Sequence, residues 1–124
     1  MSNEGKSFLN PKHTLKAFWY SWEGLKHGVR SEQALKHVLV ILVVLLGLLL
    51  WFRQWPFLAM ALCWAFVLAL ELLNAAVERV CDLVSSEYNA LIKQAKDLAS
   101  AATAVAVGAN VLLWLWVALS YWLG

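Results

Sequence analysis

The sequence predicts an all-α integral membrane protein, with an amphipathic surface helix followed by three transmembrane helices. Hydrophobic residues make up 62% of its 124 residues and charged residues only 15%, whereas globular chains contain about 45–50% and about 25%. So short a chain cannot bury that much apolar surface in a folded interior, so its surroundings must be lipid. Three spans of about 20 residues use most of the length. We therefore expect one membrane domain over 1–124 and no separate soluble catalytic domain.

The first thirty residues divide into a leader and a helix. Residues 1–11 are rich in Ser, Asn, Gly and Lys, and we expect a flexible leader there. Residues 12–30 predict an amphipathic helix, because their apolar side chains recur at spacings of three and four: Leu15, Phe18, Trp19, Trp22, Leu25 and Val29. Trp and Lys together are typical of a helix that lies among lipid headgroups. Packing of this helix against its own protein is the alternative.

Three long apolar runs predict the membrane spans, at residues 35–52, 57–80 and 98–123. The first span ends at Arg53-Gln54-Trp55-Pro56, which predicts a short hairpin leading to the second. The third span begins with a stripe of small residues, Ala99, Ala102, Ala106 and Ala109. Membrane helices approach one another closely on such surfaces, so we expect the chain to self-associate.

Residues 79–97 form a polar connection between the second and third spans, with a break expected at 85–88 and helix again over 89–97. Apart from Arg53, every Lys and Arg lies either in this connection or before position 37. The positive-inside rule therefore places the amino end in the cytosol and the carboxyl end outside. The net charge of +2 is too small to suggest nucleic acid as a partner.

An acidic side chain inside the second span is the strongest functional signal. Insertion scales assign about 2.5–3.5 kcal/mol to Asp at mid-membrane, so Glu71 is read by default as a functional residue, with a protonated, helix-joining Glu71 as the alternative. Asn74, Glu78 and Asp82 share a helix face with it, within about 60° at 100° per residue. A stripe of carboxylates at the inner surface suits a divalent cation such as Mg²⁺. A solvated helix end explains Asp82 equally well.

Further charged residues lie at the inner membrane interface. Glu32, just before the first span, either joins the acidic stripe or caps its helix. Lys96, before the third span, has the charge to hold a phosphate. Lys93 and Asp97 have the spacing of an exposed ion pair on one helix.

The run Glu71-Leu-Leu-Asn74-Ala-Ala-Val-Glu78, followed by Ser86-Glu87-Tyr88 and Ala95-Lys96-Asp97, closely resembles the small bacterial integral-membrane diacylglycerol kinases. The likeness extends upstream to Glu32 and to Tyr20-Ser21-Trp22-Glu23-Gly24-Leu25-Lys26. It covers roughly residues 12–124 with the same three-span layout. Two acids spaced around an Asn and followed by Ala-Lys-Asp are an unusual pattern for a membrane span. The pattern is therefore a highly specific sign of the resemblance.

The resemblance implies a homotrimer in the bacterial inner membrane, with composite active sites at its inner face. The implied reaction transfers the γ-phosphate of Mg-ATP to diacylglycerol and yields phosphatidate. By matched position, Glu71 accepts the proton of the lipid hydroxyl, while Glu32 and Glu78 ligate magnesium. The implied ATP contacts are Tyr20, Glu32, Glu78, Glu87, Lys96 and Asp97, and the implied lipid contacts are Glu71, Asn74 and Ser100.

The match departs from the family near the first span and leaves the lipid acceptor open. The family commonly has a second acid six residues after the one matched by Glu32, where this chain has Val38. A sister group of the same layout phosphorylates undecaprenol, although Ser86-Glu87-Tyr88 and the run after Asp97 are more similar to the diacylglycerol branch.

Two alternatives come from other functional classes. A small proton-coupled multidrug exporter would use Glu71 alone, exchanging protons for a lipophilic cation, and a non-catalytic assembly subunit would use none of these residues. Neither gives a role to Glu78 or to the Lys96-Asp97 pair, so the kinase interpretation is favoured.

Overall fold

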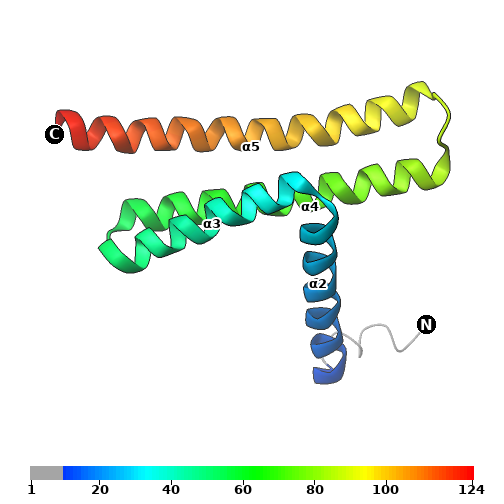
Figure 1. Ribbon diagram of the computed structural model, residues 1–124, viewed down its shortest axis with the longest axis horizontal. Helices are drawn as coiled ribbons and strands as arrows, with labels where there is room; N and C mark the ends of the chain where they lie inside the picture. Colours follow the sequence, from blue (N-terminus) through cyan, green and yellow to red (C-terminus); the bar gives the residue numbers. More distant parts are fainter. Residues whose placement is uncertain (1–9) are drawn as a thin grey trace.

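The computed structural model describes residues 10–124, and these form four helices joined by short connections (Figure 1). They are α2 (Pro11–Ser31), α3 (Gln33–Phe52), α4 (Trp55–Val84) and α5 (Ala90–Leu123). The all-helical fold class predicted from the sequence is confirmed for this part of the chain. The leader expected at residues 1–11 falls almost wholly on residues 1–9, which lie outside the described residues.

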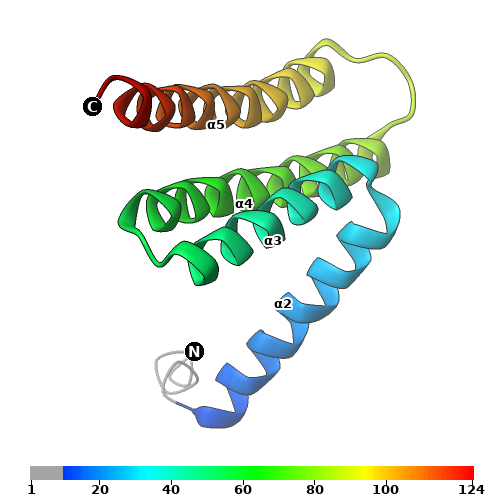
Figure 2. The ribbon, with the colours of Figure 1, turned by 60° about the vertical axis from the view of Figure 1, so that its left-hand side comes forward.

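Helix α2 runs across the direction of the other three helices (Figures 1 and 2). Its start is set by Asn10, whose side-chain oxygen accepts a hydrogen bond of 3.1 Å from the backbone N–H of Lys12, and by Pro11 in the first turn. Most of its large apolar side chains remain exposed, from 54% for Trp22 to 71% for Phe18, whereas Leu25 and Val29 are partly buried. The chain's own bundle therefore leaves this face uncovered, which favours the membrane-surface interpretation.

Gly28 allows α2 to approach α3 and α4 closely. A Cβ added there would lie 2.9 Å from Cδ1 of Leu35 and 3.2 Å from Cδ2 of Leu72. Leu35 is fully buried, so its methyl group has little room to retreat. A residue without a side chain is needed where α2 crosses the bundle.

Helices α3 and α4 are joined by a two-residue turn at Arg53 and Gln54, where the sequence predicts a hairpin. Arg53 adopts a left-handed conformation, with φ 51° and ψ 41°, and its N–H bonds to the carbonyl of Leu49 at 2.7 Å to end α3. Pro56 lies in the first turn of α4. The hydroxyl of Tyr121 donates to Oε1 of Gln54 at 2.7 Å, which ties the end of α5 to this turn.

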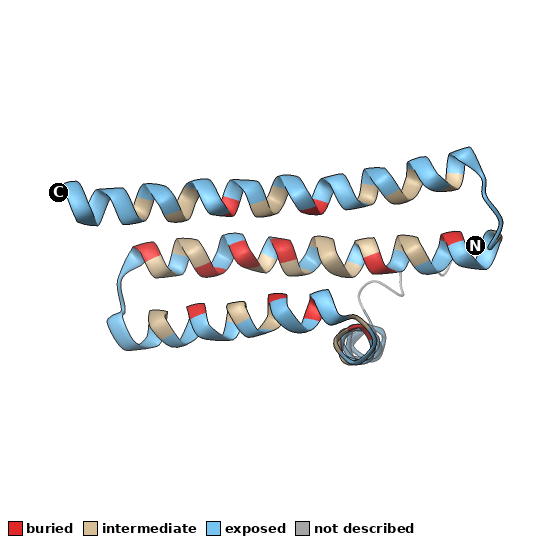
Figure 3. Cartoon of the chain, turned by 45° about the horizontal axis from the view of Figure 1, so that its top comes forward, coloured by how far each residue is buried: buried red, intermediate tan, exposed pale blue. Residues whose placement is uncertain are grey.

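Helix α4 lies between α3 and α5 and carries most of the small core (Figure 3). Its Trp64 is 5% exposed and packs against the ring of Trp114 in α5, with the ring centroids 5.2 Å apart and the planes tilted by 38°. The Trp64 indole N–H donates to the carbonyl of Val38 in α3 at 2.8 Å. From the other side, the Asn110 amide of α5 donates to the carbonyl of Cys63 at 3.2 Å. Such hydrogen bonds join helices in an apolar medium that offers few other partners.

Within residues 10–124, three helices are long and apolar enough to cross a membrane: α3, α4 and α5. Many of their apolar side chains face outward, such as Val105 at 73% exposure. Trp116 is likewise 69% exposed in the single chain. This outward apolar surface requires lipid or another chain as its neighbour.

Helices α4 and α5 are longer than the spans predicted for them. Their 30 and 34 residues correspond to about 45 Å and 51 Å at 1.5 Å per residue, against about 30 Å of hydrocarbon. The polar connection is consequently mostly helical, and only residues 85–89 separate the two helices. The expected break is present there, where Ser85 Oγ accepts a bond from the Glu87 N–H and Asn89 caps α5.

Candidate functional site

The acidic face predicted for the second span lies on one continuous helix, α4. Glu71, Asn74 and Glu78 are partly buried, whereas the side chain of Asp82 is 67% exposed. Glu71 is close enough to Glu78 and to Glu32 for their negative charges to act on it. The carboxylates of Glu32, Glu71 and Glu78 therefore form one region of negative charge, which we call the acidic region.

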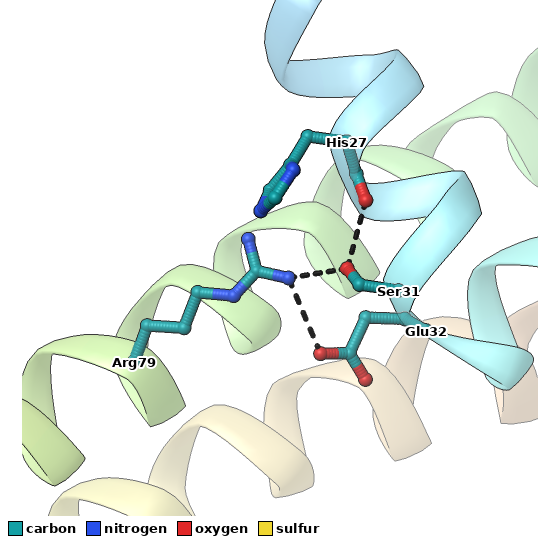
Figure 4. Close-up of polar contacts among 4 residues, drawn as sticks. All are labelled: His27, Ser31, Glu32 and Arg79. Carbon is teal, nitrogen blue, oxygen red and sulfur yellow. Dashed lines mark hydrogen bonds and ion pairs between the residues drawn. The ribbon is translucent and has the colours of Figure 1, made fainter.

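Glu32 occupies the single-residue junction between α2 and α3. It takes the N-cap position of α3, yet within the described chain its side chain makes no capping hydrogen bond, so the capping interpretation is wrong. Its Oε1 instead lies 3.5 Å from Nη2 of Arg79 on α4. Figure 4 shows the guanidinium reaching from α4 to the junction, where it also donates to the hydroxyl of Ser31. Glu32 thus joins the acidic region.

The start of α5 adds a second charged cluster. Lys96 Nζ lies 2.9 Å from Oδ1 of Asp82, which links the start of α5 to the end of α4. Lys93 and Asp97 form the ion pair that their spacing predicts, at 2.7 Å with both side chains more than 60% exposed. Exposed pairs of this kind contribute little stability, so these charges remain available to a ligand.

An open cavity of about 360 Å³ lies between α2 and α4, beside Arg79. It is bounded mainly by residues with small side chains: Gly24 and Gly28 on α2, and Ala75 and Ala76 on α4. The crossing of α2 over α4 therefore leaves room next to the acidic region.

Three of the expected site residues do not join the acidic region within a single chain. Tyr20 is 69% exposed on α2, Glu87 is exposed in the connection, and Ser100 is exposed on α5. Among residues 10–124, none of these three side chains hydrogen-bonds to the acidic region. The structure places Glu32 and Glu78 near Glu71, places Lys96 and Asp97 at the start of α5, and gives these three side chains no hydrogen bond to the acidic region among the described residues.

Asn74 places an unpartnered oxygen within the site. Its Oδ1 is buried and has no hydrogen-bond partner among the described residues. A buried hydrogen-bond acceptor without a partner costs free energy. The amide oxygen of Asn74 is therefore suited to accept a hydrogen bond from a hydroxyl group or from a second chain.

The carboxylates offer oxygen ligands for a hard cation. In the part of the chain that the structure describes, no three His, Cys, Asp or Glu side chains converge as a metal-binding cluster. Mg²⁺ is commonly held by one or two carboxylates, with water and substrate phosphates completing its shell. The donor set of Glu32 and Glu78 therefore fits an open site, which would hold a divalent cation by two carboxylates and would gain ligands when the phosphates of a nucleotide complete its shell.

Sequence reasoning missed Arg79 as a member of this site, having used it only as an inner-face positive charge. The available signal was its place directly after Glu78, on an α4 turn facing a short helix junction. Its partner could not be read from local spacing, because Glu32 is 47 residues away along the chain.

Comparisons with known proteins are consistent with this arrangement. The family model described as prokaryotic diacylglycerol kinase matches residues 19–118. The chain is 35% identical to a diacylglycerol kinase of Escherichia coli strain K12 over 102 residues, which cover 81% of this chain and 84% of that protein. It is 38% identical to the one of Pseudomonas aeruginosa over 106 residues, covering 83% and 85%. With that of Helicobacter pylori strain 26695 the identity is 31% over 107 residues, covering 83% and 82%.

Proposed function

The chain belongs to the prokaryotic diacylglycerol kinase family, and from this premise we propose that it transfers the γ-phosphate of ATP to diacylglycerol and so produces phosphatidate. Membership of the family makes it a membrane-bound lipid kinase of a bacterium. The observation that carries the proposed transfer from ATP to diacylglycerol is the acidic region. In it, the carboxylate of Glu71 lies near two further carboxylates, Glu32 and Glu78, that are suited to a metal.

Nucleotide binding is assigned to the inner ends of the helices. Glu32 and Glu78 would hold Mg²⁺ together with the phosphates of ATP. Bound magnesium supplies neutralisation of the negative charge on the transferred phosphoryl group. Lys96 is placed to attract the phosphates, and Tyr20, Glu87 and Asp97 are assigned the remaining contacts to the nucleotide by their match to the family.

Glu71 is assigned the role of general base. The lipid hydroxyl oxygen forms a bond to the γ-phosphorus, the bond from that phosphorus to the bridging oxygen breaks, and ADP leaves. Glu71 takes the hydroxyl proton, which balances the reaction. Its depth supports this role, since it lies seven residues, or about 10 Å, further into the membrane than Glu78. Asn74 and Ser100 are assigned to positioning the lipid headgroup, for which the unpartnered amide oxygen of Asn74 is suited.

The complete site is proposed to require several copies of the chain in a homotrimer. Tyr20, Glu87 and Ser100 are exposed and make no hydrogen bond to the acidic region within the described part of their own chain, so a neighbouring copy is assigned to bring such groups to it. The charges at the inner ends of α4 and α5 support an orientation with the amino end and the active site in the cytosol and the carboxyl end outside.

A product assay tests the function directly. The purified protein in detergent micelles is incubated with radiolabelled ATP, magnesium and either diacylglycerol or undecaprenol, and the lipids are separated by chromatography. Labelled phosphatidate is the expected product. Labelled undecaprenyl phosphate alone would overturn the choice of acceptor. Failure to label either lipid, in several detergents and with added phospholipid, would overturn the kinase assignment for this chain.

A further inference from the structure

The acidic region includes a cation of its own. Nη2 of Arg79 lies 3.5 Å from Oε1 of Glu32 and also donates to the hydroxyl of Ser31 (Figure 4). We propose that Arg79 pairs with the Glu32 carboxylate in the metal-free protein and competes with the divalent cation for it. This proposal rests on the proposed function for the role of Glu32 as a metal ligand. Arg79 is then a positioning residue that acts through Glu32.

The competition follows from the crowding of like charges. Glu32 and Glu78 both lie close enough to Glu71 for their negative charges to repel its carboxylate. The Glu32 side chain projects from a one-residue junction with an extended backbone and caps no helix within the described residues. A positive partner is therefore needed to draw this carboxylate to the α4 side. Arg79 is that partner in the structure, and a bound divalent cation would be a stronger one.

The contact has the properties of one that can be exchanged. The N···O distance of 3.5 Å is long for an ion pair, and the two side chains are 43% and 34% exposed, so solvent weakens the attraction. Ser31 gives the guanidinium a second partner that remains when Glu32 turns away. The Ser31 hydroxyl donates to the carbonyl of His27 at 2.7 Å, which fixes its lone pairs toward Arg79.

The proposal predicts the sign of a charge-removing substitution. Replacing Arg79 removes the competitor and one positive charge from the metal site, so the affinity for a divalent cation should rise. A role for Arg79 in merely holding α4 against the junction predicts the opposite, because a loosened Glu32 would bind the cation less well.

The test measures Mn²⁺ binding to the nucleotide-free protein in detergent by electron paramagnetic resonance of the free ion. Arg79→Gln, which keeps a hydrogen-bond donor for Ser31, should lower the Kd for Mn²⁺ by about 3- to 10-fold, the size expected for loss of one partly screened charge nearby. Arg79→Lys should restore wild-type affinity. Arg30→Gln, which removes an exposed cation from the last turn of α2, serves as the control and should leave the Kd unchanged.

A second comparison assigns the effect to Glu32. In a Glu32→Gln background, Arg79→Gln should alter the Kd by less than about 2-fold, because the site of competition is gone. An unchanged or higher Kd in Arg79→Gln, or an equal gain in both backgrounds, would overturn the proposal. Should Arg79→Gln not give a monodisperse protein, Arg79→Met provides the same measurement. Mn²⁺ binding is measured without lipid and without ATP turnover. A failure of this proposal can therefore be distinguished from a failure of the kinase assignment.

Discussion

Replacement of Glu71 by Gln should separate catalysis from nucleotide binding. The substitution keeps the size of the side chain but removes the carboxylate that we propose takes the hydroxyl proton. General-base catalysis contributes about 10²- to 10⁴-fold, so kcat should fall by that factor. The affinity for Mg-ATP should change much less. Glu71 and Glu78 are seven residues apart, about 10 Å along the helix, and at an effective dielectric constant of about 40–80 one unit charge acting on a divalent cation at that distance contributes about 0.8–1.7 kcal/mol. That energy corresponds to about a 4- to 16-fold weaker binding of the cation, still below the expected loss of kcat.

The assay measures kcat with saturating lipid and ATP in micelles, together with the Kd of a fluorescent ATP analogue in the presence of magnesium. Glu23→Gln is the matched control, because Glu23 is an exposed acid on α2 that pairs with Lys26 at 2.9 Å. It should leave both quantities unchanged. A kcat for Glu71→Gln within about 10-fold of wild type would refute the assignment of Glu71 as the base, since that loss is below what a missing base produces.

Three further substitutions test other parts of the structure. Glu78→Gln should raise the magnesium concentration needed for half-maximal activity by at least about 10-fold, because one of the two carboxylates proposed as ligands is lost; wild-type metal dependence would remove Glu78 from the proposed metal site. Gly28→Val should lower both the activity and the melting temperature, since even a Cβ there would lie 2.9 Å from a buried leucine methyl carbon of α3. Gly47→Val is its control, as an added Cβ meets nothing within 4 Å in the described chain, and equal activity of the two variants would contradict the need for close approach. Trp64→Phe should lower the free energy of unfolding in detergent by about 1 kcal/mol through loss of a buried hydrogen bond of 2.8 Å. The 69% exposed Trp116 provides the comparison, and equal destabilisation by Trp116→Phe would contradict that reason.

The helical architecture could be predicted from the sequence because its main signal is local. Apolar residues recur at helical spacing in α2, and an Arg-Gln pair followed by Trp-Pro marks the turn between α3 and α4. The lengths of α4 and α5 were not predictable in the same way. Hydropathy marks the part of a helix that lies in lipid, whereas the backbone hydrogen bonds continue into water for several turns, to Val84 and from Ala90.

The acidic face of α4 was predictable for the same reason, since Glu71, Asn74 and Glu78 share a face through helical spacing alone. The partner of Glu32 was not predictable from spacing. It depends on the angle at which α2 crosses α4, and that angle depends on tertiary packing at Gly28. Asp82 likewise pairs with Lys96 across the connection rather than continuing the acidic face, because the short break at residues 85–89 brings the two helix ends together.

The separation of Tyr20 and Ser100 from the acidic region and the outward apolar faces of the bundle have a common explanation in the proposed assembly. A thin layer of three helices exposes side chains such as Val105 on α5, and a second copy packed there would cover them. The same packing would bring polar groups of one copy toward the acidic region of another. Burial of apolar surface between copies would then supply the energy that holds the catalytic groups together. Substitutions on such faces should impair activity even where they touch neither nucleotide nor lipid.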